Sequence, residues 1–130
     1  MTNQELIAKA KEVMTKGYAP YSHFQVGAAL LAKDGRVFTG CNVENATYGA
    51  TICAERTAVT KAVSEGVREF EKIAIVASSG DYAAPCGICR QVLFEFMPEG
   101  KVVLWSELEG EKEFALTELL PFGFRGEDIK

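Results

Sequence analysis

The sequence predicts an α/β fold in which a central sheet carries helices on both faces. In the middle of the chain, segments with helical spacing of apolar residues alternate with short, mostly apolar segments, as in sheets covered by helices. The chain has 130 residues, of which 48% are hydrophobic and 25% charged, enough for one domain with a buried core. We find no internal repeat, linker or low-complexity segment, and therefore expect a single domain over residues 1–130.

The first predicted element is a helix. Thr2 and Glu5 have the spacing of a capping box, and Gly17 is expected to follow the helix end. Between them, apolar residues recur at helical intervals: Leu6, Ile7, Ala10, Val13 and Met14.

A hairpin is expected next. Residues 24–32 are mostly apolar and short, which is typical of a strand buried on both faces. Residues 33–36, Lys-Asp-Gly-Arg, form a predicted turn, and residues 37–43 form the returning strand. Residues 45–52 are expected to be a loop.

The second half alternates between helices and strands. An apolar stripe predicts a helix that ends before Gly66, with Ala54, Ala58, Val59, Ala62 and Val63 on one side. The segments that follow are a strand over 73–77, a loop over 78–85, a helix over 87–97 ended by Pro98, and strands over 102–105 and 112–116. Five strands are therefore expected, followed by a short tail.

Charge and targeting signals restrict the function. The net charge is −4 and the 14 basic residues are scattered, whereas nucleic-acid binding needs clustered Lys and Arg. The acidic residues of 107–113 would repel a phosphate backbone, so a small, weakly charged substrate fits better. The N-terminus lacks the pattern of a signal peptide and no apolar run approaches a membrane span, so we expect a cytoplasmic protein without membrane contact.

The four cysteines are expected to be metal ligands, catalytic groups or buried thiols, because disulfides are rare in a reducing compartment. Cys86 and Cys89 lie three residues apart at the start of a predicted helix, so both sulfurs point to one side. The helix N-terminus favours the thiolate, which is the form that binds zinc. A lone Cys-x-x-Cys is a weak signal that also suits a redox pair or half of a structural zinc site.

Cys53 stands at another predicted helix start and would be a third ligand. Three cysteines leave one position of a tetrahedral zinc ion open for water, as in catalytic sites. Cys41, expected to be a buried thiol, and His23, expected at the surface, remain alternatives that could close a structural site.

Glu55 favours the catalytic interpretation. If Cys53 caps the helix with a non-helical backbone, the side chains of Cys53 and Glu55 both reach one pocket. A carboxylate beside zinc-activated water is what a hydrolytic enzyme needs to move protons. A Glu in the first helical turn is also common for dipole reasons alone.

These residues lie within longer motifs, and together the motifs resemble the zinc-dependent cytidine deaminases of the short, homotetrameric type. Zinc deaminases combine a His- or Cys-x-Glu segment with Pro-Cys-x-x-Cys and a glutamate that is not a ligand. The resemblance covers nearly the whole chain and rests on residues 21–29, 42–49, 53–56, 85–91 and 119–124.

The resemblance implies a three-layer α/β/α sandwich with a mixed five-stranded sheet. It implies one Zn²⁺ per subunit, held by Cys53, Cys86 and Cys89, and hydrolysis of cytidine and deoxycytidine to the uridines and ammonia in pyrimidine salvage. Glu55 would move protons among water, N3 and the leaving amine, and Arg56 would offset the negative charge of the thiolates.

Substrate contacts follow from the same resemblance. Phe24 would flank the base, the backbone at Ala54 would meet the base edge, and a buried Glu44 would bind ribose together with Asn42. The residues expected to reach the active site of a neighbouring subunit in the homotetramer are Tyr48 and Phe124, whereas Phe122 is left as packing.

Three alternatives differ in what they require. A nucleic-acid-editing deaminase needs a basic channel, which the net charge of −4 disfavours. A non-catalytic zinc module needs a sure fourth ligand. A blasticidin-type deaminase shares the zinc pattern but lacks the Asn-x-Glu-Asn segment in the form found at residues 42–45.

Overall fold

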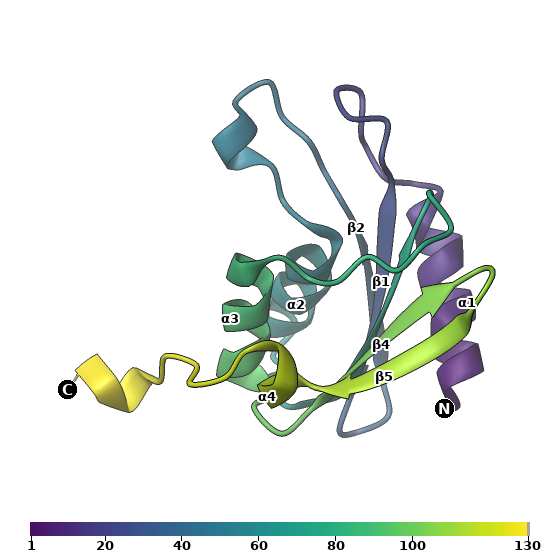
Figure 1. Ribbon diagram of the computed structural model, residues 1–130. Coiled ribbons are helices and arrows are strands. Elements are labelled where there is room, and N and C mark those ends of the chain that lie inside the picture. Colours follow the sequence, from purple (N-terminus) through teal and green to yellow (C-terminus); the bar gives the residue numbers. More distant parts are fainter. Residues whose placement is uncertain (130) are drawn as a thin grey trace.

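A computed structural model describes residues 1–129 and confirms the three-layer α/β/α fold (Figure 1). The five strands are β1 (Val26–Ala32), β2 (Val37–Cys41), β3 (Phe70–Ala77), β4 (Lys101–Ser106) and β5 (Gly110–Ala115). The main helices are α1 (Asn3–Met14), α2 (Ala54–Ser64) and α3 (Gly87–Phe96). Three short helices complete the described chain: η1 (Tyr48–Ala50), α4 (Leu116–Leu119) and η2 (Gly126–Ile129).

The sheet is mixed, as expected. Its strand order is β2-β1-β3-β4-β5, and β3 and β4 are parallel while the other neighbouring pairs are antiparallel. Helix α1 covers one face of the sheet, and α2 and α3 cover the other (Figure 1). Among residues 1–129, no helix is long and apolar enough to cross a bilayer.

Helix α1 begins at the predicted capping box. The Thr2 side chain accepts a hydrogen bond from the Glu5 backbone N–H over 3.1 Å, and the Glu5 carboxylate accepts from the Thr2 N–H over 2.9 Å. These contacts satisfy two backbone donors that a helix leaves free at its first turn. The helix ends at Met14, and Leu6, Ile7 and Ala10 are buried against the sheet.

Strand β1 is buried on both faces and separates two apolar clusters. Ala28 and Leu30 pack in the larger cluster beneath α2 and α3. Ala29 and Leu31 point the other way, into the cluster beneath α1. The alternation of side chains along a strand therefore explains why nearly every residue of β1 is apolar.

Two glycines let helices approach the sheet closely from opposite faces. A Cβ added at Gly27 of β1 would lie 2.1 Å from the carbonyl oxygen of Ala10 in α1. A Cβ added at Gly40 of β2 would lie 2.5 Å from the backbone nitrogen of Ala58 in α2. Because glycine has no side chain, the backbone of α1 packs directly against β1 and the backbone of α2 packs directly against β2.

The structure shifts the boundaries of all five predicted strands by one to three residues; β1 starts at Val26 and not at residue 24, and β2 ends at Cys41 and not at residue 43. Strand β3 starts at Phe70, three residues before the predicted start, because Phe70 still pairs with Ala32 of β1. Strand β5 ends at Ala115, and Leu116, predicted as its last residue, begins the short helix α4. The Glu118 carboxylate accepts from the Ala115 N–H over 2.8 Å and closes this turn, which is too short to show helical periodicity in the sequence.

Three connecting segments leave the sheet at the same end. Val26 pairs with Ala77 and Gly27 pairs with Cys41, so the entry to β1 lies beside the exits of β2 and β3. The segments before β1 and between β2 and α2 rise at this end in Figure 1. The third segment joins β3 to α3. Cys53 lies where the segment after β2 enters α2, and Cys86 and Cys89 lie where the segment after β3 enters α3.

Candidate metal centre and substrate cavity

Two cysteines cap two different helices. Cys53 precedes α2 with φ −70° and ψ 152°, and Cys86 precedes α3 with φ −67° and ψ 169°. Both backbones are extended, and neither side chain makes a capping hydrogen bond. The sulfurs are thus free to turn away from their own helices, as the capping interpretation of Cys53 predicted.

The structure brings three sulfurs together. The Sγ atoms of Cys53, Cys86 and Cys89 all lie within 4.8 Å of one another, and those of Cys53 and Cys86 are 3.9 Å apart. Two sulfurs held about 2.3 Å from one tetrahedral zinc ion lie about 3.8 Å apart, so the spacing fits zinc. The donor set also fits, because thiolates are preferred zinc ligands.

No fourth protein ligand joins this group within residues 1–129. Cys41 is half-buried, not fully buried as predicted, and its thiol points to the carbonyl oxygen of Lys16 at 3.6 Å. His23 is exposed and outside the group. Three protein ligands with an open position are typical of catalytic zinc sites, whereas structural sites have four.

Arg56 supplies positive charge to the cluster from the first turn of α2. Its guanidinium donates to the Sγ of Cys53 over 3.6 Å and to the carbonyl oxygen of Thr51 over 3.3 Å. The Nε of Arg56 is buried and has no hydrogen-bond partner among the described residues. The half-buried Arg56 thus directs its terminal nitrogen to the cluster and to the segment that enters α2.

The thiols have unequal proton affinities before a metal binds. Hydrogen bonds from Cys89, and then from Arg56 and Cys86, lower the pKa of Cys53 to about 5. The pKa of Cys89 is raised because its thiol is the hydrogen-bonding partner of Cys53 and is buried. The hydrogen-bonded pair of Cys53 and Cys89 therefore favours one thiolate, and binding of a metal by both sulfurs releases the proton that the pair still shares.

Glu55 is a buried carboxyl beside the sulfurs. Only 5% of its surface is exposed, although it lies in the first turn of α2. Burial raises its pKa to about 7, and the charge of Cys53 acts in the same direction. A carboxyl that titrates near neutral pH is suited to both accepting and donating a proton.

A cavity of about 220 Å³ opens beside the cluster. Two ligands, Cys53 and Cys86, form part of its wall. The cavity is also lined by five other residues that the sequence singled out: Phe24, Asn42, Glu44, Ala54 and Glu55. Phe24 comes from the segment before β1, Asn42 and Glu44 from the segment after β2, and Ala54 and Glu55 from the first turn of α2.

Two polar residues of the cavity wall, Asn42 and Glu44, are held by the backbone before β1. The amide oxygen of Asn42 accepts from the Val26 N–H over 2.9 Å, and its nitrogen donates to the Phe24 carbonyl over 2.8 Å. The Glu44 carboxylate accepts from the N–H groups of Tyr21 and Ser22, at 3.0 and 3.1 Å. Glu44 is half-buried, which corrects the prediction that it is buried.

Tyr48 and Phe124 do not line this cavity. Tyr48 is 74% exposed on η1, and its ring contacts that of Tyr21 edge-on, with centroids 5.9 Å apart. Phe124 is 56% exposed, and its backbone is fixed to α3 because Gln91 donates to its carbonyl and accepts from its N–H, at 2.8 and 3.1 Å. Phe122, expected to be packing, is fully exposed instead.

The structure adds lining residues to which the sequence assigned no role. They are Ser22, Val26, Thr51, Ala83 and Ala84. Ser22 and Val26 belong to the motif over residues 21–29, so motif membership was a signal, but small loop residues carry no periodicity that points to a cavity.

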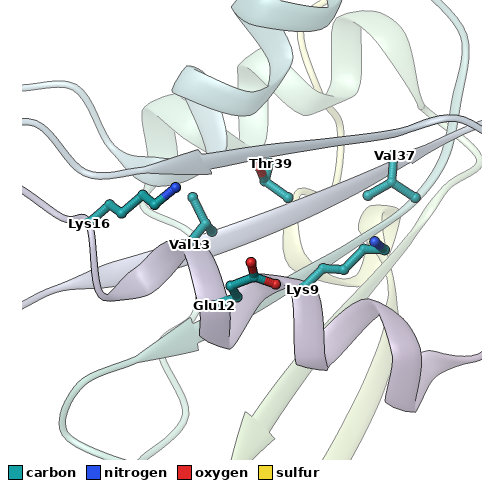
Figure 2. Close-up of a pocket in the computed structure, with 6 residues that line it drawn as sticks. All are labelled: Lys9, Glu12, Val13, Lys16, Val37 and Thr39. Atoms are coloured by element: carbon teal, nitrogen blue, oxygen red, sulfur yellow. The ribbon is translucent and has the colours of Figure 1, made fainter.

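A second cavity, of about 280 Å³, lies between α1 and β2 (Figure 2). Lys9, Glu12 and Val13 of α1 line it together with Lys16, just beyond the end of that helix, and with Val37 and Thr39 of β2. It has neither a cysteine nor an aromatic side chain in its wall. The chemistry described above therefore belongs to the cavity beside the sulfurs.

Comparisons with known proteins identify the family. The sequence model of one protein family, described as "Cytidine and deoxycytidylate deaminase zinc-binding region", matches residues 1–105. The chain is 48% identical over 130 residues to a cytidine deaminase of Sporosarcina psychrophila, with 99% of this chain and 96% of that protein covered. It is 50% identical over 130 residues to a cytidine deaminase of Halalkalibacterium halodurans, with 99% and 98% covered.

Solved structures are similar as well. The crystal structure of a cytidine deaminase from Burkholderia pseudomallei has a TM-score of 0.90 and 48% identity, with 95% of this chain and 100% of that chain covered. The crystal structure of a cytidine deaminase from Mycobacterium tuberculosis has a TM-score of 0.83 and 39% identity, with 95% and 98% covered.

Proposed function

This chain belongs to the zinc-binding family of cytidine and deoxycytidylate deaminases, which are hydrolytic enzymes, and from that premise we propose that it deaminates cytidine and deoxycytidine. Water would replace the 4-amino group, so that the nucleoside and water yield the corresponding uridine and ammonia. The observation that carries the proposal is the cavity that contains the buried Glu55 carboxyl and lies beside the cluster of three sulfurs, two of which line its wall.

Cys53, Cys86 and Cys89 are placed to hold zinc at the wall of this cavity. When bound, zinc lowers the pKa of a water to about 7 and thereby supplies a nucleophile at neutral pH. Three thiolates bring more negative charge than Zn²⁺ neutralises, which works against forming that nucleophile. Arg56 and the N-termini of α2 and α3 would offset the excess.

Glu55 is the proposed proton carrier. Its carboxylate would take a proton from the attacking water, deliver it to N3 of the pyrimidine, and later help to protonate the leaving amine. The raised pKa near 7 supports this role, because the same group must accept and then release a proton at one pH.

The remaining cavity residues would hold the nucleoside. Phe24 would flank the base, and the backbone near Ala54 would meet its edge. Asn42 and Glu44 would bind ribose hydroxyls, and the negative charge of Glu44 would repel a phosphorylated sugar. We therefore expect nucleosides to be used and nucleotides to be rejected.

We further propose that residues 1–130 act as one catalytic domain in a cytoplasmic homotetramer that serves pyrimidine salvage. Tyr48 and Phe124 would complete the cavity of a neighbouring subunit. Their high exposure and their absence from the cavity of their own chain support this placement. No nucleic acid or membrane partner is proposed, in keeping with the net charge of −4.

The test is ammonia release from cytidine and deoxycytidine by the zinc-loaded protein, with uridine or deoxyuridine formed in equal amount. Cytidine 5′-monophosphate should react far more slowly. Absence of ammonia release from zinc-replete protein would overturn the proposed reaction.

Subunit sharing has a separate test. Chains carrying Phe124→Ala and chains carrying Glu55→Gln would be co-expressed and compared with either variant alone. If Phe124 acts on its neighbour, mixed assemblies recover activity, because an intact Glu55 then meets an intact Phe124 from the other chain. Activity equal to the sum of the two variants would contradict the sharing.

A further inference from the structure

Three hydrogen-bond donors in the segment before β1 bind the Glu44 carboxylate. The Tyr21 and Ser22 N–H groups both donate to Oε1, over 3.0 and 3.1 Å. The Ser22 hydroxyl donates to the other oxygen, Oε2, in a short hydrogen bond. An ionised carboxylate has about four lone-pair positions, so one acceptor position remains for a ligand.

The same hydroxyl also contacts the backbone that carries Phe24. Ser22 Oγ accepts a hydrogen bond from the Phe24 N–H over 3.0 Å. The chain can fold back in this way because His23, between them, has a left-handed backbone with φ 59°. Its N–H donates to the Ala19 carbonyl over 2.9 Å, which closes the turn.

We propose that Ser22 is a positioning residue whose hydroxyl fixes the Glu44 carboxylate and the Phe24 backbone relative to each other, so that the sugar-binding and base-binding sides of the cavity form one unit. The inference deepens the proposed function and rests on it. Ser22 itself is not required to touch the reacting atoms.

A hydroxyl suits this place because it donates and accepts at once. Its O–H serves the carboxylate while its lone pair serves the Phe24 N–H. Alanine removes both contacts, and threonine retains the hydroxyl. The hydrogen bond from Ser22 also lowers the pKa of Glu44, together with the two N–H donors and the charge of His23. Glu44 thus stays an ionised acceptor.

If Ser22 served only to stabilise the fold, its replacement would lower stability and leave substrate binding unchanged. Ser22 is exposed, so its loss creates no buried cavity and should not lower stability appreciably. The effect should instead appear in substrate binding, since Glu44 and Phe24 would contact parts of the nucleoside remote from the reacting carbon.

The experiment compares Ser22→Ala, Ser22→Thr, Glu44→Gln and the double variant Ser22→Ala/Glu44→Gln, all zinc-loaded, with cytidine as substrate. Ser22→Ala should raise KM roughly tenfold or more, as expected for a lost hydrogen bond to a charged group, with a much smaller change in kcat. Ser22→Thr should restore most of the affinity. In the Glu44→Gln background, Ser22→Ala should add much less, because its main partner is already altered. Ser64→Ala removes an exposed hydroxyl that donates to the Lys61 carbonyl at the end of α2, and is the matched control.

Additive effects of Ser22→Ala and Glu44→Gln, a loss confined to kcat, or a wild-type KM in Ser22→Ala would each overturn the proposal. A wild-type protein that releases no ammonia refutes the proposed function instead. In that event the pKa of the Glu44 carboxyl is measured by ¹³C NMR in the wild type and in Ser22→Ala. His23 is present in both proteins, so its charge affects both measurements alike. If the Ser22 hydroxyl binds the Glu44 carboxylate, the pKa of Glu44 is higher in Ser22→Ala than in the wild type. An unchanged pKa overturns the proposed contact.

Discussion

The guanidinium of Arg56 joins the Sγ of Cys53, at 3.6 Å, to the carbonyl oxygen of Thr51, at 3.3 Å. One side chain therefore links the first sulfur of the cluster to the segment that enters α2. This contact both adds positive charge beside a thiolate and limits how far the backbone before Cys53 can move.

Replacing this arginine should weaken zinc binding. In Arg56→Gln the Cys53 thiolate loses a charged donor, and groups that orient and polarise metal ligands typically contribute about 10–100-fold to metal affinity. Competition with a chromophoric chelator measures the change. Arg68→Gln, at an exposed position after the same helix, should retain zinc as the wild type does. Equal zinc affinity in both variants would contradict the assigned role.

Cysteine substitutions should divide into two groups. Cys86→Ser removes a sulfur of the cluster, and we expect the purified variant to hold less than one zinc per chain and to lose activity. Cys41→Ser should keep both, because Cys41 contacts the Lys16 carbonyl outside the cluster. Metal analysis of the two proteins provides the measurement, and full zinc occupancy in Cys86→Ser would show that the ligand set is wrong.

Glu55→Gln should separate chemistry from metal binding. The amide has nearly the same shape but cannot carry the proton, so turnover should fall by at least about 10²–10⁴-fold while zinc is retained. Ammonia release and zinc content are measured on the same sample. Glu65→Gln, at the exposed end of the same helix, is the control for loss of one negative charge. Near-normal turnover in Glu55→Gln would refute the proton-carrier role.

The buried carboxyl also predicts how stability depends on pH in the metal-free protein. The pKa of Glu55 is raised from 4.5 to about 7, so the folded state holds this proton more tightly than the unfolded state does. Its contribution is therefore fully present below pH 4.5 and is lost as pH rises towards 7. Over that window the free energy of unfolding should fall, relative to Glu55→Gln, by an amount on the order of 3 kcal/mol.

Urea denaturation of the two chelator-treated proteins at several pH values measures this difference. The cysteines are the same in both proteins, so their titration largely cancels in the comparison. Parallel pH profiles would mean that Glu55 ionises in the folded state as readily as in the unfolded chain.

Gly27→Ala should destabilise the fold without touching the site. The new Cβ would meet the Ala10 carbonyl oxygen at 2.1 Å, so α1 must shift from the sheet. Overpacking of this kind typically costs about 1–3 kcal/mol, or more where backbone must move. Gly126→Ala is the matched control, since nothing lies within 4 Å of its added Cβ. Thermal denaturation compares them, and equal melting temperatures would contradict the close approach.

The sequence by itself determined the features that depend on neighbours a few residues apart. The capping box of Thr2 and Glu5 and the placement of Cys86 and Cys89 on one side at the start of α3 both follow from local backbone geometry. Such contacts close within one helical turn, and the residue types that favour them are visible directly in the chain. The continuous apolar run of β1 likewise predicted a strand covered on both faces.

Tertiary structure alone decided how distant segments meet. The pairing of β1 with β2 and β3 brings Ser22 to Glu44, and it directs the Asn42 side chain onto the backbone of Phe24 and Val26. The half-buried position of Glu44 and the early start of β3 have the same origin. Register between strands that are distant in the chain depends on which faces become buried in the fold, so no single short stretch of sequence carries it. The sequence therefore named seven of the residues that line the cavity, and the tertiary structure added the others and set the contacts among them.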